Sequence, residues 1–135
     1  MIASPLAGNV IGADRSQFVI AEWRDAGGAR GEKRLIAPTH LHRSDDEAWY
    51  VLEGTLGFRV GDDDVEARAG SAVLVPAGTA HTYWNSSEDP ARYLIIMTPN
   101  IHHLIQAIHA MPVRTRDALA AVFEEHDSTL LPDQE

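Results

Sequence analysis

The chain contains no cysteine, and this absence excludes two kinds of site. Neither a disulfide framework nor a thiolate metal centre can be built, and the redox compartment is left open. Long apolar runs are also missing, since no stretch is long enough to cross a bilayer. Residues 1–15 lack the basic segment and apolar core of a secretory signal. We therefore expect a cytoplasmic protein that makes no membrane contact.

Basic residues are scarce. The chain has 11 Lys and Arg against 20 Asp and Glu, which gives a net charge of −9 at pH 7. Clustered Lys and Arg are what bind phosphate backbones, so this balance argues against nucleic acid as a partner. A length of 135 residues suits one domain that can bury a core, and 44% hydrophobic residues are ordinary for a globular protein.

Most of the chain shows the composition and spacing of short β-strands. We expect residues 1–14 to form a loose arm and residues 15–98 to form an antiparallel barrel or sandwich, because turn signals recur at regular intervals. The expected strands cover Gln17–Arg24, Lys33–Ala37 leading into His40, Trp49–Leu52, Leu56–Val60, Val65–Arg68, Ala72–Val75, Thr82–Trp84 and Arg92–Met97.

The periodicity changes to that of helices over residues 99–127. Thr98 and Pro99 supply an N-cap and a proline at the first helical position. Apolar residues then follow at three- and four-residue steps, at Ile101, Leu104, Ile105, Ile108 and Met111. Thr115 is expected to cap a second helix that buries Leu119, Val122 and Phe123. Residues 128–135 are expected to be a tail.

Four residues of metal-ligand type stand out. His40 and His42 are separated by one residue, so on a strand both side chains point to the same side. A turn over Arg43–Asp46 allows Glu47 to face them from a neighbouring strand, and His81 follows a Pro-Ala-Gly turn. Three imidazoles and one carboxylate suit Zn, Fe, Ni, Co or Mn, which predicts one divalent transition metal per chain.

The same residues resemble the two signature motifs of the cupin superfamily. His40, His42, Glu47 and Gly54 match the first motif, although Arg34 stands where the family has glycine. The second motif is matched by Gly70, Pro76, Gly78, His81 and Asn85. The resemblance implies an all-β fold, the double-stranded β-helix or jelly-roll barrel, with the C-terminal helices packed outside. It also implies a homodimer, for which the Gln17–Arg24 strand, the preceding arm and exposed Phe18 and Trp23 are candidates.

Alternation along the strands predicts what surrounds the metal. Trp49 and Val51 share the face of Glu47, and Tyr83 shares the face of His81, so we expect these three to line an apolar substrate pocket. Glu47 and Tyr83 are the candidate catalytic residues, with Glu47 as a general base if it binds the metal loosely. Core packing is the alternative role for Trp49 and Tyr83.

Other acidic and histidine clusters have simpler interpretations. Asp62–Asp64 follow a glycine but lack the remaining positions of a calcium loop, so we expect a hairpin turn. His102, His103 and His109 lack the i,i+4 pair of a zinc helix and are expected to be exposed. Asn85 is expected to hold a turn rather than a substrate.

Function is left with three candidates, because a fold alone does not fix an activity. The first is a dioxygenase acting on a small aromatic or enolisable substrate, similar to the quercetinase-like cupins that cleave flavonols. The second is a metal-dependent isomerase or lyase of a small sugar or acid, which would need basic residues inside the barrel; Lys33, Arg34 and Arg59 are the nearby ones. The third is a barrel that binds a small molecule without turnover.

Overall fold

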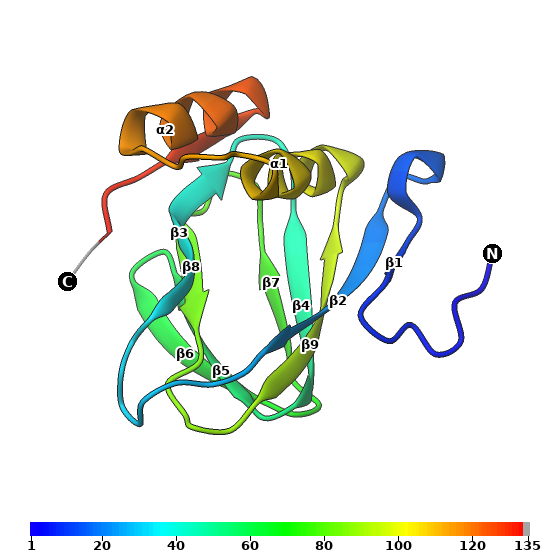
Figure 1. The fold of residues 1–135 in the computed structure, drawn as a ribbon, viewed down its shortest axis with the longest axis vertical. Helices are drawn as coiled ribbons and strands as arrows, with labels where there is room; N and C mark the ends of the chain where they lie inside the picture. Colours follow the sequence, from blue (N-terminus) through cyan, green and yellow to red (C-terminus); the bar gives the residue numbers. More distant parts are fainter. Residues whose placement is uncertain (134–135) are drawn as a thin grey trace.

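The computed structural model describes residues 1–133 and places two antiparallel sheets face to face (Figure 1). One sheet has the order β1 (Val10–Ile11), β2 (Val19–Asp25), β9 (Ala91–Met97), β4 (Glu47–Glu53) and β7 (Ala72–Val75). The other has the order β10 (Ser128–Leu130), β3 (Leu35–His42), β8 (His81–Trp84), β5 (Thr55–Val60) and β6 (Asp63–Arg68). The expectation of an all-β jelly-roll fold is confirmed.

The core lies between the two sheets. Along β4 and β9 the buried residues alternate with more exposed ones, as period-two side chains require. Their inner faces meet those of β5 and β8 in a cluster that includes Val51, Leu56, Phe58 and Tyr93. The ring of Phe58 stacks on that of Tyr83, with centroids 5.6 Å apart and an interplanar angle of 14°. This packing holds the strands that carry the site.

Two motif glycines make the tight turns that the strands need. Gly54, between β4 and β5, has φ 76°, and a Cβ there would lie 2.5 Å from the carbonyl oxygen of Pro90. Gly78, in the turn before β8, has φ 81°, and its N–H donates to the carbonyl oxygen of His42 over 2.6 Å. Such backbone conformations favour glycine. The second turn therefore ties the start of β8 to the end of β3.

Two helices lie over one end of the sheets. Helix α1 (Pro99–His109) is capped by the Thr98 side chain, which accepts from the N–H of Ile101, and helix α2 (Arg116–Glu125) is capped by Thr115 in the same way. In Figure 1 both helices lie across the same end of the two sheets. Among the described residues, neither helix has the length and apolar character to cross a membrane.

Both ends of the chain differ from expectation. Residues 1–14, expected as a loose arm, contain β1, which pairs with β2, and part of a short 3-10 helix, Ala13–Arg15. Ser128–Leu130, expected within the tail, form β10 and pair with His40–His42 of β3. A strand of three residues is too short to show alternation, which is why the sequence did not reveal it. Of the remaining tail positions, 131–133 are described without regular secondary structure, and 134 and 135 lie outside the described residues.

Candidate metal centre

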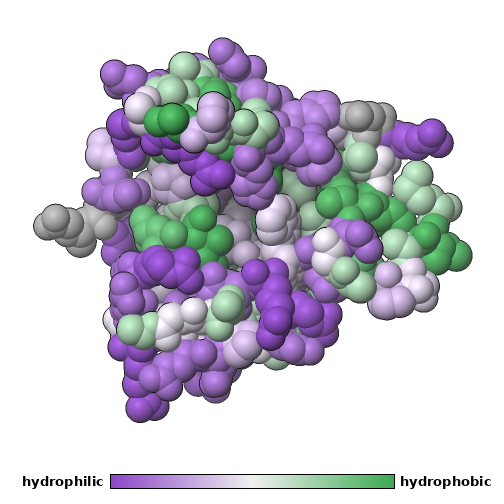
Figure 2. All heavy atoms as spheres, in the orientation of Figure 1, coloured by the Kyte–Doolittle hydropathy of each residue, from purple (hydrophilic) through white to green (hydrophobic). Residues whose placement is uncertain are grey.

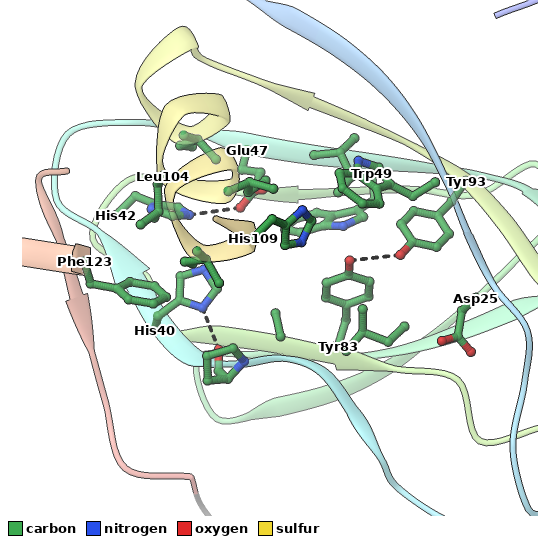
Figure 3. Close-up of a pocket in the computed structure, with 18 of the residues that line it drawn as sticks. Asp25, His40, His42, Glu47, Trp49, Tyr83, Tyr93, Leu104, His109 and Phe123 are labelled. Carbon is green, nitrogen blue, oxygen red and sulfur yellow. Dashed lines mark hydrogen bonds and ion pairs between the residues drawn. The ribbon is translucent and has the colours of Figure 1, made fainter. Parts of the chain in front are cut away.

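The four ligand-type residues converge at one point. One ligand atom from each of His40, His42, Glu47 and His81 lies within 4.8 Å of the others, and all four side chains are buried. They come from the end of β3, the first residue of β4 and the first residue of β8. Figure 3 shows His40, His42 and Glu47 grouped at one end of the pocket. The structure thus brings together the four residues that the sequence singled out.

In His40 and His81 the outer ring nitrogen, Nδ1, which points away from the cluster, forms a hydrogen bond with the backbone. Nδ1 of His40 lies 2.6 Å from the Pro38 carbonyl oxygen, and Nδ1 of His81 lies 2.9 Å from that of Thr79. A carbonyl oxygen only accepts, so each Nδ1 carries a proton. In the neutral imidazole the remaining nitrogen, Nε2, then has a free lone pair. Backbone contacts of this kind are what usually orient metal-binding histidines.

The ligand atoms that face one another inside the cluster form an arrangement that a cation would stabilise. Oε1 of Glu47 lies 3.1 Å from Nε2 of His42 and 3.2 Å from Nε2 of His81. A carboxylate oxygen and unprotonated ring nitrogens are all acceptors, so at these distances their lone pairs repel one another unless a proton or a metal ion lies between them. Three nitrogens and one carboxylate form a common donor set for divalent transition metals. The buried cluster therefore suits a single metal ion.

Electrostatics keep the metal-binding charge states in place. Burial would raise the pKa of Glu47, but in the metal-free cluster, where a proton lies between the ring nitrogens and Oε1, hydrogen bonding with His42 and His81 outweighs burial and lowers this pKa from 4.5 to about 2. The pKa of His40 is lowered from 6.5 to about 3, mainly by burial and in addition by the neighbouring His81 and His42. Glu47 is thus ionised and His40 is neutral near pH 7, as metal coordination requires.

A cavity of about 260 Å³ extends from this cluster between the two sheets. Its lining is mainly apolar and aromatic, and helices α1 and α2 contribute Ile101, Leu104, Ile105, Ile108, His109, Leu119 and Phe123. The Phe123 ring contacts His40, with centroids 5.1 Å apart. The helices therefore close the end of the barrel where the cluster lies. This volume is at the low end for ligand pockets, so the site admits only small molecules.

The expected pocket residues differ in position. Trp49 and Tyr83 line the cavity, with ring centroids 5.5 Å apart, and Trp49 also lies 5.7 Å from the ring of His81. Val51 does not line it: the side chain is fully buried in the core, one pleat further along β4. Alternation gave the correct face of the strand but could not show how deep the cavity reaches.

Tyr83 has a partner that the sequence did not suggest. Its hydroxyl lies 3.0 Å from that of Tyr93 on β9, and Figure 3 shows the pair at the end of the pocket away from His40 and His42. Burial raises the pKa of Tyr83 well above 10 and that of Tyr93 to about 12. Both phenols are neutral and can donate a hydrogen bond. Tyr93 lies on an alternating strand, so its inward direction could have been found.

Two further expectations are wrong. His102 is buried rather than exposed, because it lies on the face of α1 that packs toward the barrel, whereas His103 and His109 are exposed. Trp23 is not an exposed interface residue: it packs against the core, lines the cavity and meets the His109 ring edge-on, with centroids 5.4 Å apart. Asn85 holds a turn as expected, through contacts with Ser87 and Asp89.

Comparison with known proteins agrees with this architecture. The family model described as Cupin domain matches residues 31–97. An uncharacterized protein of Streptomyces coelicolor is 39% identical over 54 residues, which are 40% of this chain and 50% of that protein. The matched segment therefore covers half the length of the Streptomyces coelicolor protein.

Solved structures show the same fold. A sugar phosphate isomerase from a cupin superfamily, from Silicibacter pomeroyi, is 25% identical with a TM-score of 0.54; the match covers 63% of this chain and 52% of that one. A polyketide cyclase from Streptomyces resistomycificus is 25% identical with a TM-score of 0.51, covering 61% and 54%. This chain thus spans about half the length of these two structures.

Proposed function

This chain belongs to the cupin superfamily, and from that premise we propose that it is a mononuclear metal-dependent enzyme of dioxygenase type. The proposed substrate is a small aromatic or enolisable organic molecule. The observation that carries the proposal is the position of a buried three-histidine, one-glutamate cluster at the end of an apolar, aromatic cavity. When bound there, a divalent metal supplies Lewis acidity toward a substrate oxygen.

The surrounding side chains have distinct proposed roles. His40, His42, His81 and Glu47 are the proposed ligands. Trp49 forms a flat wall beside His81, and the neutral Tyr83–Tyr93 pair offers a hydrogen bond to an oxygen at the far end of the substrate. Burial under α1 and α2 excludes water from the reacting atoms.

Glu47 has a second proposed role as proton acceptor for a substrate hydroxyl. Its low pKa makes the carboxylate a weak base, which favours the ligand role over this one. The Glu47→Gln variant separates them. If Glu47 accepts the proton, the variant keeps bound metal and loses turnover; if Glu47 is mainly a ligand, metal content and turnover fall together.

Dioxygen uptake tests the proposal. Metal-free protein is loaded with Fe(II), Ni(II) or Co(II) and given catechols, enolisable diketones and flavonols. We expect uptake coupled to loss of one substrate class, abolished in His81→Ala and kept in His103→Ala, whose exposed histidine does not line the cavity. Absence of uptake with every metal and substrate from a protein shown to hold metal would contradict the dioxygenase assignment.

A metal-dependent isomerase or lyase is the second candidate, favoured by the similarity to the sugar phosphate isomerase. Such substrates need charged partners in the cavity. Lys33 and Arg59 instead pair with Asp64, and neither lines the cavity. Arg34 pairs with Asp25 and does not line it either. Two other basic residues, Arg24 and Arg114, do line the cavity and could meet a charged substrate. Most of the remaining lining is apolar or aromatic, which favours the first candidate. A non-catalytic small-molecule barrel would be indicated by intact folding without metal uptake.

We propose a homodimer with a small molecule, rather than nucleic acid, as ligand. Figure 2 shows apolar residues gathered where Figure 1 places β1 and the N-terminal segment. This surface exposes Met1, Ile2, Val10 and Phe18. Exposed apolar patches of this kind commonly mark interfaces. Light scattering should give the mass of two chains, and Phe18→Ser should shift it toward one; the mass of one chain for wild type would contradict the dimer.

A further inference from the structure

Ser128 lies beside the metal cluster although it is far from the cupin motifs in sequence. It is the first residue of β10, is fully buried, and pairs across the sheet with His42. Its Oγ lies 2.8 Å from Nδ1 of His42, a contact that joins residues 86 positions apart. This residue also lies outside the segment matched by the family model, residues 31–97. His42 is thus the proposed ligand whose outer nitrogen is met by a side chain rather than by a backbone carbonyl.

The direction of this hydrogen bond follows from counting protons. A serine hydroxyl has a single proton, and that of Ser128 is donated to the carbonyl oxygen of His126 over 3.0 Å. The lone pairs of Oγ are therefore left to accept from Nδ1–H of His42. With the proton on Nδ1, the neutral ring has its free lone pair on Nε2, the nitrogen that faces Glu47 and the other imidazoles.

His42 has a competing arrangement that would prevent coordination. Oε1 of Glu47 lies 3.1 Å from Nε2 of His42 and could accept a proton from it. In that tautomer Nε2 has no lone pair for a metal. Ser128 favours the opposite tautomer because its oxygen offers an acceptor to Nδ1. The same carbonyl of His126 also accepts from Asn100 over 2.8 Å, which holds the acceptor of the Ser128 proton in place.

We propose that Ser128 is a positioning residue that holds His42 with its proton on Nδ1 and its Nε2 lone pair toward the metal. The inference rests on the proposed metal-dependent function and deepens it, since it assigns part of the centre to the C-terminal strand. Loss of such an outer contact typically lowers metal affinity by about 10- to 100-fold.

The Ser128→Ala variant has different effects on the two states of the protein. Without metal, His42 can place its proton on Nε2 and donate to Glu47, so no buried donor is left without an acceptor. With metal, Nδ1–H loses its acceptor and stays buried, which is unfavourable. We therefore expect a small change in the melting temperature of the metal-free protein and a loss of affinity for Zn(II). A purely structural serine would lower the melting temperature in both states alike.

The experiment measures Zn(II) affinity by competition with a chromogenic chelator, together with metal-free melting. The matched control is Thr129→Val, which changes the next residue of β10, whose hydroxyl contacts Arg43 instead. We expect ~10- to 100-fold weaker binding for Ser128→Ala, wild-type binding within about twofold for Thr129→Val, and recovery in Ser128→Thr, which keeps the hydroxyl. Equal affinities in Ser128→Ala and wild type would overturn the inference.

A second measurement does not depend on how the variants fold. Long-range proton–nitrogen NMR of the Zn(II)-loaded wild-type protein shows which ring nitrogen of each histidine binds metal. We expect coordination of His42 through Nε2 with a proton on Nδ1. Coordination through Nδ1 would overturn the inference. If the wild-type protein binds no Zn(II) or other divalent metal, the proposed function fails instead, and the two failures are thereby distinguished.

Discussion

At the scale of single residues, proton positions decide what the centre can do. His40 and His81 each donate Nδ1–H to a backbone carbonyl two residues earlier in the chain, so their orientation is local. Tyr83 and Tyr93 are neutral phenols that share a hydrogen bond. The site therefore combines a region of fixed lone pairs with a phenol pair that has one hydroxyl proton left to donate.

Replacing Tyr83 by phenylalanine tests the phenol pair. The change removes the hydroxyl and keeps the ring that stacks on Phe58. We expect metal affinity within about twofold of wild type and a fall in kcat/KM on the order of 100-fold, since a positioned proton donor contributes at least that much. Tyr50→Phe is the matched control, because it removes the hydroxyl of an exposed tyrosine that does not line the cavity. Unchanged kcat/KM in Tyr83→Phe would remove this residue from the reaction.

The sequence could predict which four residues converge, because their positions follow from local rules. Alternation places His40 and His42 together, and the Pro76–Gly78 turn places His81. Ser128 and Tyr93 were missed for different reasons. Ser128 meets His42 only through pairing of β10 with β3, which no nearby pattern encodes. Tyr93 shows ordinary alternation, but its hydroxyl partner is set by the distance between the two sheets.

At the scale of elements, Arg43 binds the C-terminal segment next to His42, a proposed ligand. Its guanidinium donates to the side chains of Glu124, Asp127 and Thr129 and to the carbonyl oxygen of Ser128. Most of these contacts are exposed and individually weak. The Phe123 ring also contacts His40, and Ser128 contacts His42, so α2 and β10 are connected to the proposed metal ligands.

Metal binding should therefore slow hydrogen exchange in β10 and in α2. A metal ion that binds only while a segment is folded stabilises the folded state of that segment by mass action. We expect backbone amides of Ser128–Leu130 to exchange at least about tenfold more slowly with Zn(II) than after chelation. The β5–β6 hairpin, at the far edge of the sheet, serves as the internal reference. Equal effects of metal on β10 and on this hairpin would contradict the connection.

The strands with clear alternation were found from the sequence, and those without it were missed. The strand Ala72–Val75 was found as a short apolar run between turn signals. The helix caps Thr98 and Thr115 were also predicted correctly, because capping depends only on neighbouring residues. Strands β1 and β10 were not found, since two or three residues show no periodicity. The depth of the cavity also escaped prediction, which is why Val51 was placed in its wall.

At the scale of the whole molecule, the buried cluster links stability to pH. In the metal-free protein the pKa of His40 is about 3, below its ordinary value of 6.5, so the unfolded chain takes up this proton first as pH falls. Glu47, with a pKa of about 2 instead of 4.5, acts in the same direction at lower pH. The unfolded state binds more protons, so acid destabilises the fold.

We expect the free energy of unfolding of the metal-free protein to fall between ~pH 6.5 and ~pH 3, and to change little above that range through these two groups. Urea unfolding at a series of pH values measures it. His40→Gln removes the titrating imidazole and should flatten the upper part of the decline. A wild-type urea midpoint that stays constant from ~pH 7 to ~pH 4 would disagree with these charge states.

Metal stoichiometry tests the central claim most directly. Protein stripped of metal is titrated with Zn(II) or Co(II), and bound metal is counted by elemental analysis after removal of excess. We expect one ion per wild-type chain with a rise in melting temperature, and loss of both in His40→Ala and in His81→Ala. Equal metal content in wild type and in both variants would show that these imidazoles and Glu47 do not form the metal centre.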